Sequence, residues 1–224
     1  MHFTKRLRQR KNGDGMKAFI FTGGSITPEN ITEKREKDDI VIAADSGYLN
    51  ALKMNFTPDV LVGDFDSLDR KKVKENIEIV ELPPEKDLTD TQVACKIALD
   101  SGADQIFLIG GLDGRLDHTF SNVAILRMLC EKRVYSYITD GQNRVRYIKN
   151  TNAIIVRSPF KYLSVLADDD VVKGVDIEGC KYPLKNAKIR KDHQFAVSNE
   201  IVGNCALVNV KKGGVFIIES GYGE

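Results

Sequence analysis

Aspartate side chains follow three apolar segments that the pattern predicts to be strands. Asp45 follows one such segment, and Asp64 and Asp66 follow the next. A third acidic cluster, Asp87 with Asp90, comes after a further predicted strand. Because ligands of open α/β sheets bind outside the carboxyl ends of the strands, we expect these side chains to converge. Converging carboxylates repel one another unless a cation joins them, and Mg²⁺ that also holds a polyphosphate is the usual occupant.

Asp64 and Asp66 lie two residues apart at the end of a predicted strand, so their side chains point to the same face and both could approach one metal. A strand-terminal turn explains such a pair equally well. Two other enzyme classes also fit this pair. In phosphatases of the haloacid dehalogenase type the first aspartate is a nucleophile, and in many glycosyltransferases the pair holds the metal of a sugar nucleotide.

The cluster at 87–90 opens a predicted helix. Asp87 or Thr89 makes a good N-cap, and Gln92 completes a capping box with Thr89. Capping does not explain Lys86, which stands where a phosphate-binding cation would lie. The cluster is therefore interpreted both as a helix start and as a candidate phosphate contact.

A glycine-bearing loop between a strand and a helix leads to Arg115. Glycines let backbone N–H groups approach a phosphate, and a helix N-terminus favours an anion. A cation at a helix start is unfavourable, so Arg115 indicates either an anionic ligand or an ion pair with Asp117. His118 follows at once and fits either a ligand contact or an ordinary surface position.

The order of these elements predicts two domains. We expect a disordered basic extension at 1–15, a doubly wound, mostly parallel α/β domain at 16–141, and an all-β sandwich at 142–224. The predicted strands of the first domain are 18–22, 40–44, 60–62, 77–82, 105–109 and 134–139, and its helices are 48–54, 69–76, 89–100 and 116–131. The predicted strands of the second are 145–149, 153–156, 162–167, 171–177, 195–197, 206–210 and 215–219.

Composition places the chain in the soluble globular class, since 42% of its residues are hydrophobic and 29% are charged. No apolar run approaches the roughly 18 residues of a membrane span. The four cysteines form no CxxC pair, which favours reduced thiols and a cytoplasmic location. We expect neither a membrane nor a nucleic-acid partner. The Walker-type phosphate loop is also missing, so any phosphate must bind through acids with a metal, cations and backbone amides.

Five motifs taken together, in this order and spacing, closely resemble the thiamine pyrophosphokinase family. They are Ala-Asp-Ser-Gly at 44–47, Pro-Asp-Val-Leu-Val-Gly-Asp-Phe-Asp-Ser at 58–67, Lys-Asp-Leu-Thr-Asp at 86–90, Gly-Arg-Leu-Asp-His at 114–118, and Gly-Cys-Lys-Tyr-Pro-Leu at 179–184 followed by Ser-Asn-Glu at 198–200. The resemblance covers nearly the whole chain after Met16. The chain departs from the family pattern at Asp113, where the family often has glycine, and by having no tryptophan.

The resemblance implies roles for individual residues. Mg²⁺ and the ATP phosphates would be engaged by Asp64, Asp66 and Asp90. The nucleotide or its phosphates would be contacted by Asp45, Lys86, Asp87, Thr89, Arg115, Asp117 and His118. Thiamine would be held by Ser198, Asn199 and Glu200, in a homodimer whose thiamine site lies between the α/β domain of one subunit and the β domain of the other.

The implied reaction moves a pyrophosphoryl group from ATP to the hydroxyl of thiamine and gives thiamine diphosphate and AMP. Asp90 or Asp117 would take the proton of the attacking alcohol. The alternatives are a Mg²⁺-dependent nucleotide phosphohydrolase or phosphatase, with Asp64 as nucleophile, and a non-catalytic sensor that binds thiamine or nucleotide.

Overall fold

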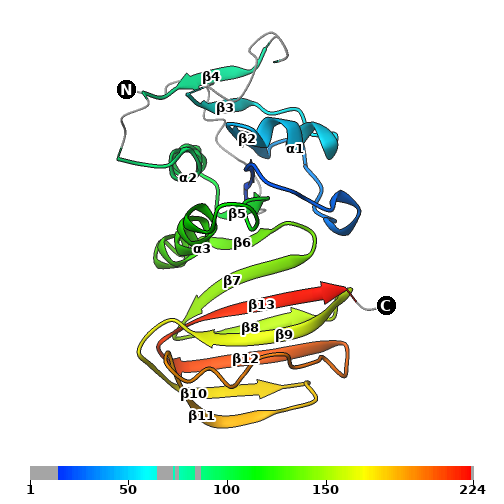
Figure 1. Cartoon of the computed structure of the whole chain (residues 1–224), viewed down its shortest axis with the longest axis vertical. Coiled ribbons are helices and arrows are strands. Elements are labelled where there is room, and N and C mark those ends of the chain that lie inside the picture. The colour runs from blue at the N-terminus through cyan, green and yellow to red at the C-terminus, as the bar shows by residue number, and fades with distance from the viewer. Residues whose placement is uncertain (1–14, 65–72, 74–75, 84–86, 223–224) are drawn as a thin grey trace.

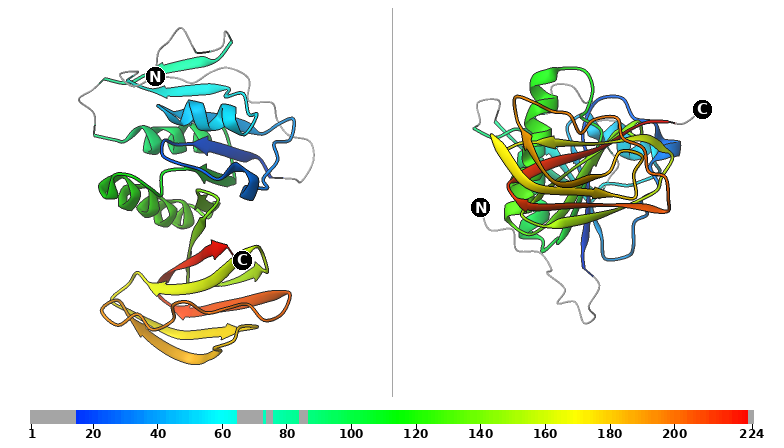
Figure 2. Two further views of the ribbon diagram at one scale, coloured as in Figure 1. Left: turned by 45° about the vertical axis from the view of Figure 1, so that its right-hand side comes forward. Right: turned by 90° about the horizontal axis from the view of Figure 1, so that it is seen from below.

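The computed structural model describes residues 15–64, 73, 76–83 and 87–222. An α/β part and a β-sandwich lie one above the other along the long axis of the molecule (Figure 1), and a turned view shows the same arrangement (Figure 2). The predicted extension at 1–15 lies, apart from Gly15, outside the described residues.

A nine-stranded sheet runs through the molecule. Its first six strands, in spatial order, are β4 (Glu78–Glu81), β3 (Val60–Gly63), β2 (Ile40–Ala44), β1 (Lys17–Phe21), β5 (Gln105–Ile109) and β6 (Tyr135–Thr139). Within this set, every pair of neighbouring strands is parallel. The chain winds outward from β1 in both directions, so the strand order reverses between β1 and β5, where such folds bind their ligands.

Helices cover both faces of these strands. The helix α1 (Gly47–Lys53) packs on the face that carries Phe19 and Phe21, whereas α2 (Asp90–Asp100) and α3 (Leu116–Glu131) pack on the opposite face. Successive residues of β1 therefore pack into two separate cores, one on each face of the sheet. A short 3₁₀ helix, η1 (Pro28–Asn30), lies in the segment between β1 and β2. The prediction of a doubly wound sheet is confirmed.

The sandwich is built partly from the same large sheet. Its first layer is β7 (Asn143–Lys149), β13 (Gly214–Tyr222) and β9 (Phe160–Ala167), and its second is β11 (Leu184–Arg190), β10 (Val171–Glu178), β12 (Cys205–Lys212) and β8 (Asn152–Val156). The two layers bury a common apolar core. The predicted sandwich is thus confirmed, and because β7 pairs with β6, the hydrogen-bonded sheet continues across residues 140–143.

Two details of the second half differ from the sequence prediction. The predicted strand at 195–197 is wrong: this segment forms no strand, although the Ala196 carbonyl accepts a hydrogen bond from the Val165 N–H at 2.7 Å. The strand β11 was not predicted, because it is a largely exposed edge strand without an apolar run. Its Asn186 has a φ of +47°, and its N–H donates to Asp176 at 2.7 Å, which marks a local irregularity in the strand. The predicted helix at 69–76 falls mostly outside the described residues.

Within the described part of the chain, no helix is both long enough and apolar enough to cross a membrane.

Candidate active site

Two glycine pairs meet at the point where the strand order reverses. Gly23 begins the loop after β1, and Gly110 and Gly111 begin the loop after β5. The Gly111 N–H donates to the Gly23 carbonyl at 2.8 Å. A Cβ atom on Gly110 would lie 2.8 Å from the Thr22 carbonyl oxygen, and its φ of +96° also requires glycine. The close approach of the two loops therefore depends on residues without side chains.

Two buried asparagine side chains, one from α1 and one from α3, hold these loops through hydrogen bonds to backbone carbonyls. The side-chain amide of Asn50, on α1, donates to the carbonyls of Thr22 at 2.8 Å and Gly24 at 2.9 Å. The amide of Asn122, on α3, donates to the Gly111 carbonyl at 3.1 Å. The sequence did not indicate this role for either asparagine, although a Gly-Gly pair after each of two strands was a signal that the two loops approach closely.

Asp113 joins the same two loops. Both of its carboxylate oxygens accept a hydrogen bond from the Ser25 N–H, at 3.0 Å each. This residue is one of the departures from the family pattern, and the contact gives it a structural role. It ties the loop after β5 to the loop after β1.

The carboxylates predicted at the strand ends lie at the same edge of the sheet. Asp45 follows β2 directly, and its N–H donates to the Val62 carbonyl at 2.7 Å. Its φ is +48°, and its Oδ1 atom is buried. Asp64 is the first residue after β3 and is half-buried. Asp66, the other member of the pair, lies outside the described residues, as does Lys86.

The start of α2 carries the predicted capping box. The Gln92 N–H donates to Thr89 Oγ1 at 3.2 Å, and the Thr89 N–H donates to Gln92 Oε1 at 2.9 Å. Thr89 is therefore the N-cap, and Asp87 is exposed just before it. Asp90, which is half-buried, is the first residue of the helix, where the helix dipole favours a carboxylate.

The chemistry of this donor set fits Mg²⁺, which prefers carboxylate oxygens together with water and phosphate oxygens. Asp45, Asp64 and Asp90 supply such oxygens from the ends of β2 and β3 and from the start of α2. Among the described residues, no group of three or more His, Cys, Asp or Glu side chains is already placed to hold a metal ion.

The sequence left two interpretations of Arg115, an anionic ligand or an ion pair with Asp117, and the structure contains the ion pair. Arg115 donates to Asp117 through Nε at 3.2 Å and through Nη2 at 2.5 Å, and both side chains are exposed. Their hydrogen bond lowers the pKa of Asp117 and raises that of Arg115. His118 is exposed. Hereafter the strand-end site means residues 22–25, 45, 64, 89–90 and 110–118.

The residues predicted for thiamine lie in the sandwich. Ser198 is exposed and has a φ of +55°. Asn199 is buried, and its side chain donates to the Tyr182 carbonyl at 2.7 Å and accepts from the Tyr182 N–H at 3.0 Å. Glu200 forms an ion pair with Lys181 at 3.4 Å. Asn199 thereby holds Tyr182, whose side chain is 59% exposed and was not singled out from the sequence.

Comparison with known families accounts for both parts of the chain. A model of the thiamin pyrophosphokinase catalytic domain matches residues 32–138, and a model of the thiamin pyrophosphokinase vitamin B1 binding domain matches residues 151–215. The chain belongs to the thiamine pyrophosphokinase family. The strand-end site lies largely in the catalytic match, and residues 198–200 lie in the vitamin B1 match.

Individual members of the thiamine pyrophosphokinase family agree with this assignment. The curated thiamine pyrophosphokinase of Bacillus subtilis is 26% identical over 208 residues, which cover 90% of this chain and 97% of the relative. The crystal structure of the Bacillus subtilis enzyme has a TM-score of 0.82 at 24% identity, covering 92% and 99% of the two chains. The crystal structure of thiamin pyrophosphokinase from Geobacillus thermodenitrificans has a TM-score of 0.80 at 25% identity, covering 92% and 97%.

Proposed function

We propose that this protein is a thiamine diphosphokinase, which transfers a pyrophosphoryl group from ATP to the hydroxyl of thiamine and releases thiamine diphosphate and AMP. The observation that carries the proposal is the presence, in one chain, of both the catalytic and the vitamin B1 binding matches. The glycine pairs at the reversal of strand order support it, because the absence of side chains there lets a polyphosphate approach the backbone closely.

The strand-end site would bind ATP. The alcohol of thiamine must attack the β-phosphorus so that AMP leaves, and catalysis of such transfers is mostly positioning and neutralisation of charge. Arg115 and Lys86 would neutralise phosphate charge, and Asp87, Thr89 and His118 would contact the nucleotide. Arg115 is exposed, and among the described residues its ion-pair partner is its neighbour Asp117, so it can turn to a phosphate without leaving a buried charge behind.

Asp64, Asp66 and Asp90 would hold Mg²⁺, with Asp45 at the same edge of the sheet. The bound ion would neutralise charge on the phosphate oxygens. A carboxylate must also take the proton of the attacking alcohol. Asp90 and Asp117 are the candidates for this step, and pairing with Arg115 lowers the pKa of Asp117 and so weakens it as a base.

The exposed edge of the sandwich would bind thiamine. Thiamine is a cation, so the Glu200 carboxylate and the exposed ring of Tyr182 are suitable contacts. Ser198 would offer its hydroxyl, and Asn199 would act by holding Tyr182 in place. Tyr182 would supply the aromatic surface in a chain that has no tryptophan.

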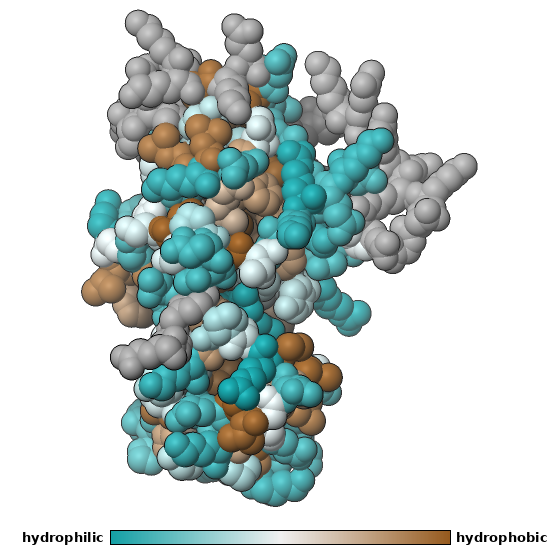
Figure 3. Space-filling view, turned by 90° about the vertical axis from the view of Figure 1, so that its right-hand side faces the viewer, coloured by the Kyte–Doolittle hydropathy of each residue, from teal (hydrophilic) through white to brown (hydrophobic). Residues whose placement is uncertain are grey.

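A homodimer with the thiamine site shared between subunits is part of the proposal. Large apolar side chains lie exposed on both parts of the molecule, including Leu116 at 70% and Phe120 at 71% on α3, and Ile154 at 63% and Val156 at 70% on β8. Figure 3 shows apolar residues reaching the surface in both parts, among hydrophilic ones. Leu116 and Phe120 lie one turn apart on α3, and Ile154 and Val156 lie two residues apart on β8; exposed apolar groups that adjoin one another suit a surface that another chain covers.

We also propose the functional division predicted from the sequence, with ATP and Mg²⁺ bound by residues 16–141 and thiamine by residues 142–224. The continuous sheet would then serve as a common scaffold for both. The proposed location is the cytoplasm, in agreement with the four free cysteines.

The test is product analysis on the purified full-length protein with ATP, thiamine and Mg²⁺. AMP and thiamine diphosphate in equal amounts, dependent on thiamine and abolished by EDTA, are expected. ADP as product would contradict attack on the β-phosphorus. Phosphate release without thiamine would indicate a phosphohydrolase, and tight ligand binding without turnover would indicate a sensor.

Substitution separates the proposed metal site from general effects. Asp64→Asn should lower kcat at least 100-fold while circular dichroism stays unchanged. Asp100→Asn, at the exposed end of α2, is the matched control and should keep wild-type activity. More than a tenth of wild-type activity in Asp64→Asn would contradict the metal assignment.

A further inference from the structure

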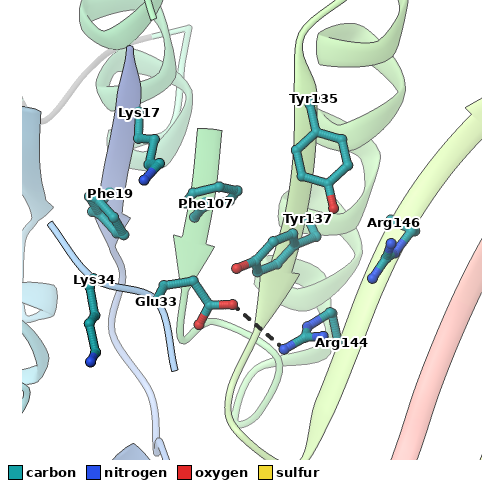
Figure 4. A pocket seen from close by; sticks show the side chains of 9 residues that line it. All are labelled: Lys17, Phe19, Glu33, Lys34, Phe107, Tyr135, Tyr137, Arg144 and Arg146. Atoms are coloured by element: carbon teal, nitrogen blue, oxygen red, sulfur yellow. Dashed lines mark ion pairs between the residues drawn. The ribbon is translucent and has the colours of Figure 1, made fainter. Parts of the chain in front are cut away.

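A pocket lies on the face of the sheet that carries α1, and it is separate from the strand-end site. Its volume is about 290 Å³, and it is lined by Lys17, Phe19, Glu33, Lys34, Phe107, Tyr135, Tyr137, Arg144 and Arg146 (Figure 4). Lys17 and Tyr135 are the first residues of their strands, whereas the strand-end site lies at the opposite ends of the parallel strands. Nothing in the proposed reaction uses this pocket.

Aromatic rings form one wall of the pocket. Phe107 and Tyr137 are stacked, with ring centroids 4.7 Å apart and planes at 28°. Tyr135 meets both rings edge-on at 6.3 Å and is half-exposed. A flat ring entering the pocket would therefore find an exposed aromatic surface on Tyr135, and aromatic pairs of this kind contribute beyond the area they bury.

The guanidinium of Arg144 is held in place but not hydrogen-bonded. It lies 5.1 Å from the Tyr137 ring and 5.2 Å from the Phe160 ring, and its side chain is only 16% exposed. Its carboxylate neighbours are beyond hydrogen-bond distance, with Glu33 at 3.6 Å and Glu219 at 3.7 Å. Among the described residues it has no hydrogen-bond acceptor, which is unusual for a largely buried guanidinium with five N–H donors.

The Glu33 carboxylate also lines the pocket, where Arg144 is its ion-pair partner at 3.6 Å (Figure 4). Glu219 accepts from Arg146 at 2.8 Å and from Ser158 at 3.0 Å, so its carboxylate is engaged by groups other than Arg144. Lys17 is paired with Glu36. Lys34, on the rim, adds a positive charge for which no salt bridge is found within the described residues. The pocket thus combines an aromatic wall, a positioned guanidinium whose ion pairs are longer than hydrogen bonds, and one further cation, Lys34, on its rim.

We infer that this pocket binds a small flat anion, an aromatic ring that carries a carboxylate or a phosphate group. The planar fork of Arg144 matches an anion with two adjacent oxygens, and the rings that hold it reduce the entropy lost on binding. The ring of the ligand would lie against Tyr135, and the positive charge of Lys34 at the rim would attract the anion. Thiamine, a cation, has the wrong charge for this position.

Calorimetry on the full-length protein with four probes tests the inference. Nicotinate carries a ring and a carboxylate, phenyl phosphate a ring and a phosphate, nicotinamide a ring without charge, and acetate a charge without a ring. Saturable binding of nicotinate or phenyl phosphate, at least tenfold tighter than nicotinamide and acetate, is expected. The tighter of the two ring-bearing anions identifies the anionic group. Equal binding of all four probes, or none, would overturn the inference.

Two variants locate the binding. Arg144→Lys keeps the charge but loses the fork, and Tyr135→Leu removes the half-exposed ring; each should weaken the preferred probe at least fivefold. Arg190→Lys, at an exposed ion pair in the sandwich, is the matched control and should bind like the wild type. If Arg144→Lys fails to fold, Tyr135→Leu still decides the question, because unchanged binding in that variant places the ligand elsewhere and refutes the inference.

Discussion

Replacing Asn50 with alanine removes the side chain that holds the loop after β1. The amide of Asn50 makes two hydrogen bonds, at 2.8 and 2.9 Å, to the carbonyls of Thr22 and Gly24, and the residue is 3% exposed. Each hydrogen bond contributes about 1 kcal/mol net, and a buried carbonyl left without a donor costs more. The free energy of unfolding should therefore fall by about 2–3 kcal/mol.

The effect should appear in stability and in nucleotide binding. In a protein of this size 1 kcal/mol corresponds to about 2–4 °C, so the melting temperature should fall by about 5–10 °C. If about 1 kcal/mol of this loss comes from disordering the loop after β1, ATP binding weakens by the same amount, and the KM for ATP should rise about fivefold. Thermal and urea unfolding followed by circular dichroism give the first quantity, and product formation at varied ATP gives the second.

The matched control is Asn152→Ala, because Asn152 is exposed at the start of β8 and surface substitutions change stability by less than about 0.5 kcal/mol. A change in Asn50→Ala as small as that of the control would refute the reasoning. A large loss of stability with an unchanged KM for ATP would keep the packing role but reject the link between this loop and the nucleotide.

Three further predictions concern stability and reactivity. Thr89→Ala removes the N-cap of α2 and should cost about 1 kcal/mol in urea unfolding, whereas Thr89→Ser should cost less than half of that. Glu219→Gln leaves the buried guanidinium of Arg146 without its charged partner and should cost about 3–5 kcal/mol, and a loss below 1 kcal/mol would show that the ion pair is not stabilising. At pH 8 a thiol reagent should modify the exposed Cys205 and leave Cys95 unmodified in the folded protein. Burial raises the pKa of Cys95 to about 12, so its thiol stays protonated and unreactive until the pH approaches that value, and equal labelling of the two would contradict this.

Much of the α/β part could be predicted because its strands are short and apolar on both faces. The strands at 40–44 and 105–109 and the helix at 116–131 have the predicted bounds. Strands covered on both faces show as short, continuous apolar runs, and their length and flanking residues distinguish them from helices. The edge strand β11 escaped prediction because its pairing depends on backbone hydrogen bonds to β10 and hardly on its own side chains.

The candidate site was predictable where chemistry depends on residue type, and less so where it depends on contact. The position of Asp45 and Asp64 at neighbouring strand ends followed from the pattern of apolar runs. The roles of Asn50 and Asn122 did not, because an asparagine that ties two loops has no periodic signal and its partners are backbone atoms distant in sequence. The contact of Asp113 with Ser25 was hidden for the same reason, since 88 residues separate them.

The order in which the strands are made matters for how the protein is completed. The last strand of the chain, β13, lies between β7 and β9 in the large sheet, pairing with both. Until the ribosome has delivered residues 214–222, both neighbours present open edges that can pair with other chains. The ladder closes late and over a long sequence separation, which slows folding and prolongs exposure to aggregation. Loss of residues 214–222 would therefore remove the strand that joins β7 to β9 in the large sheet.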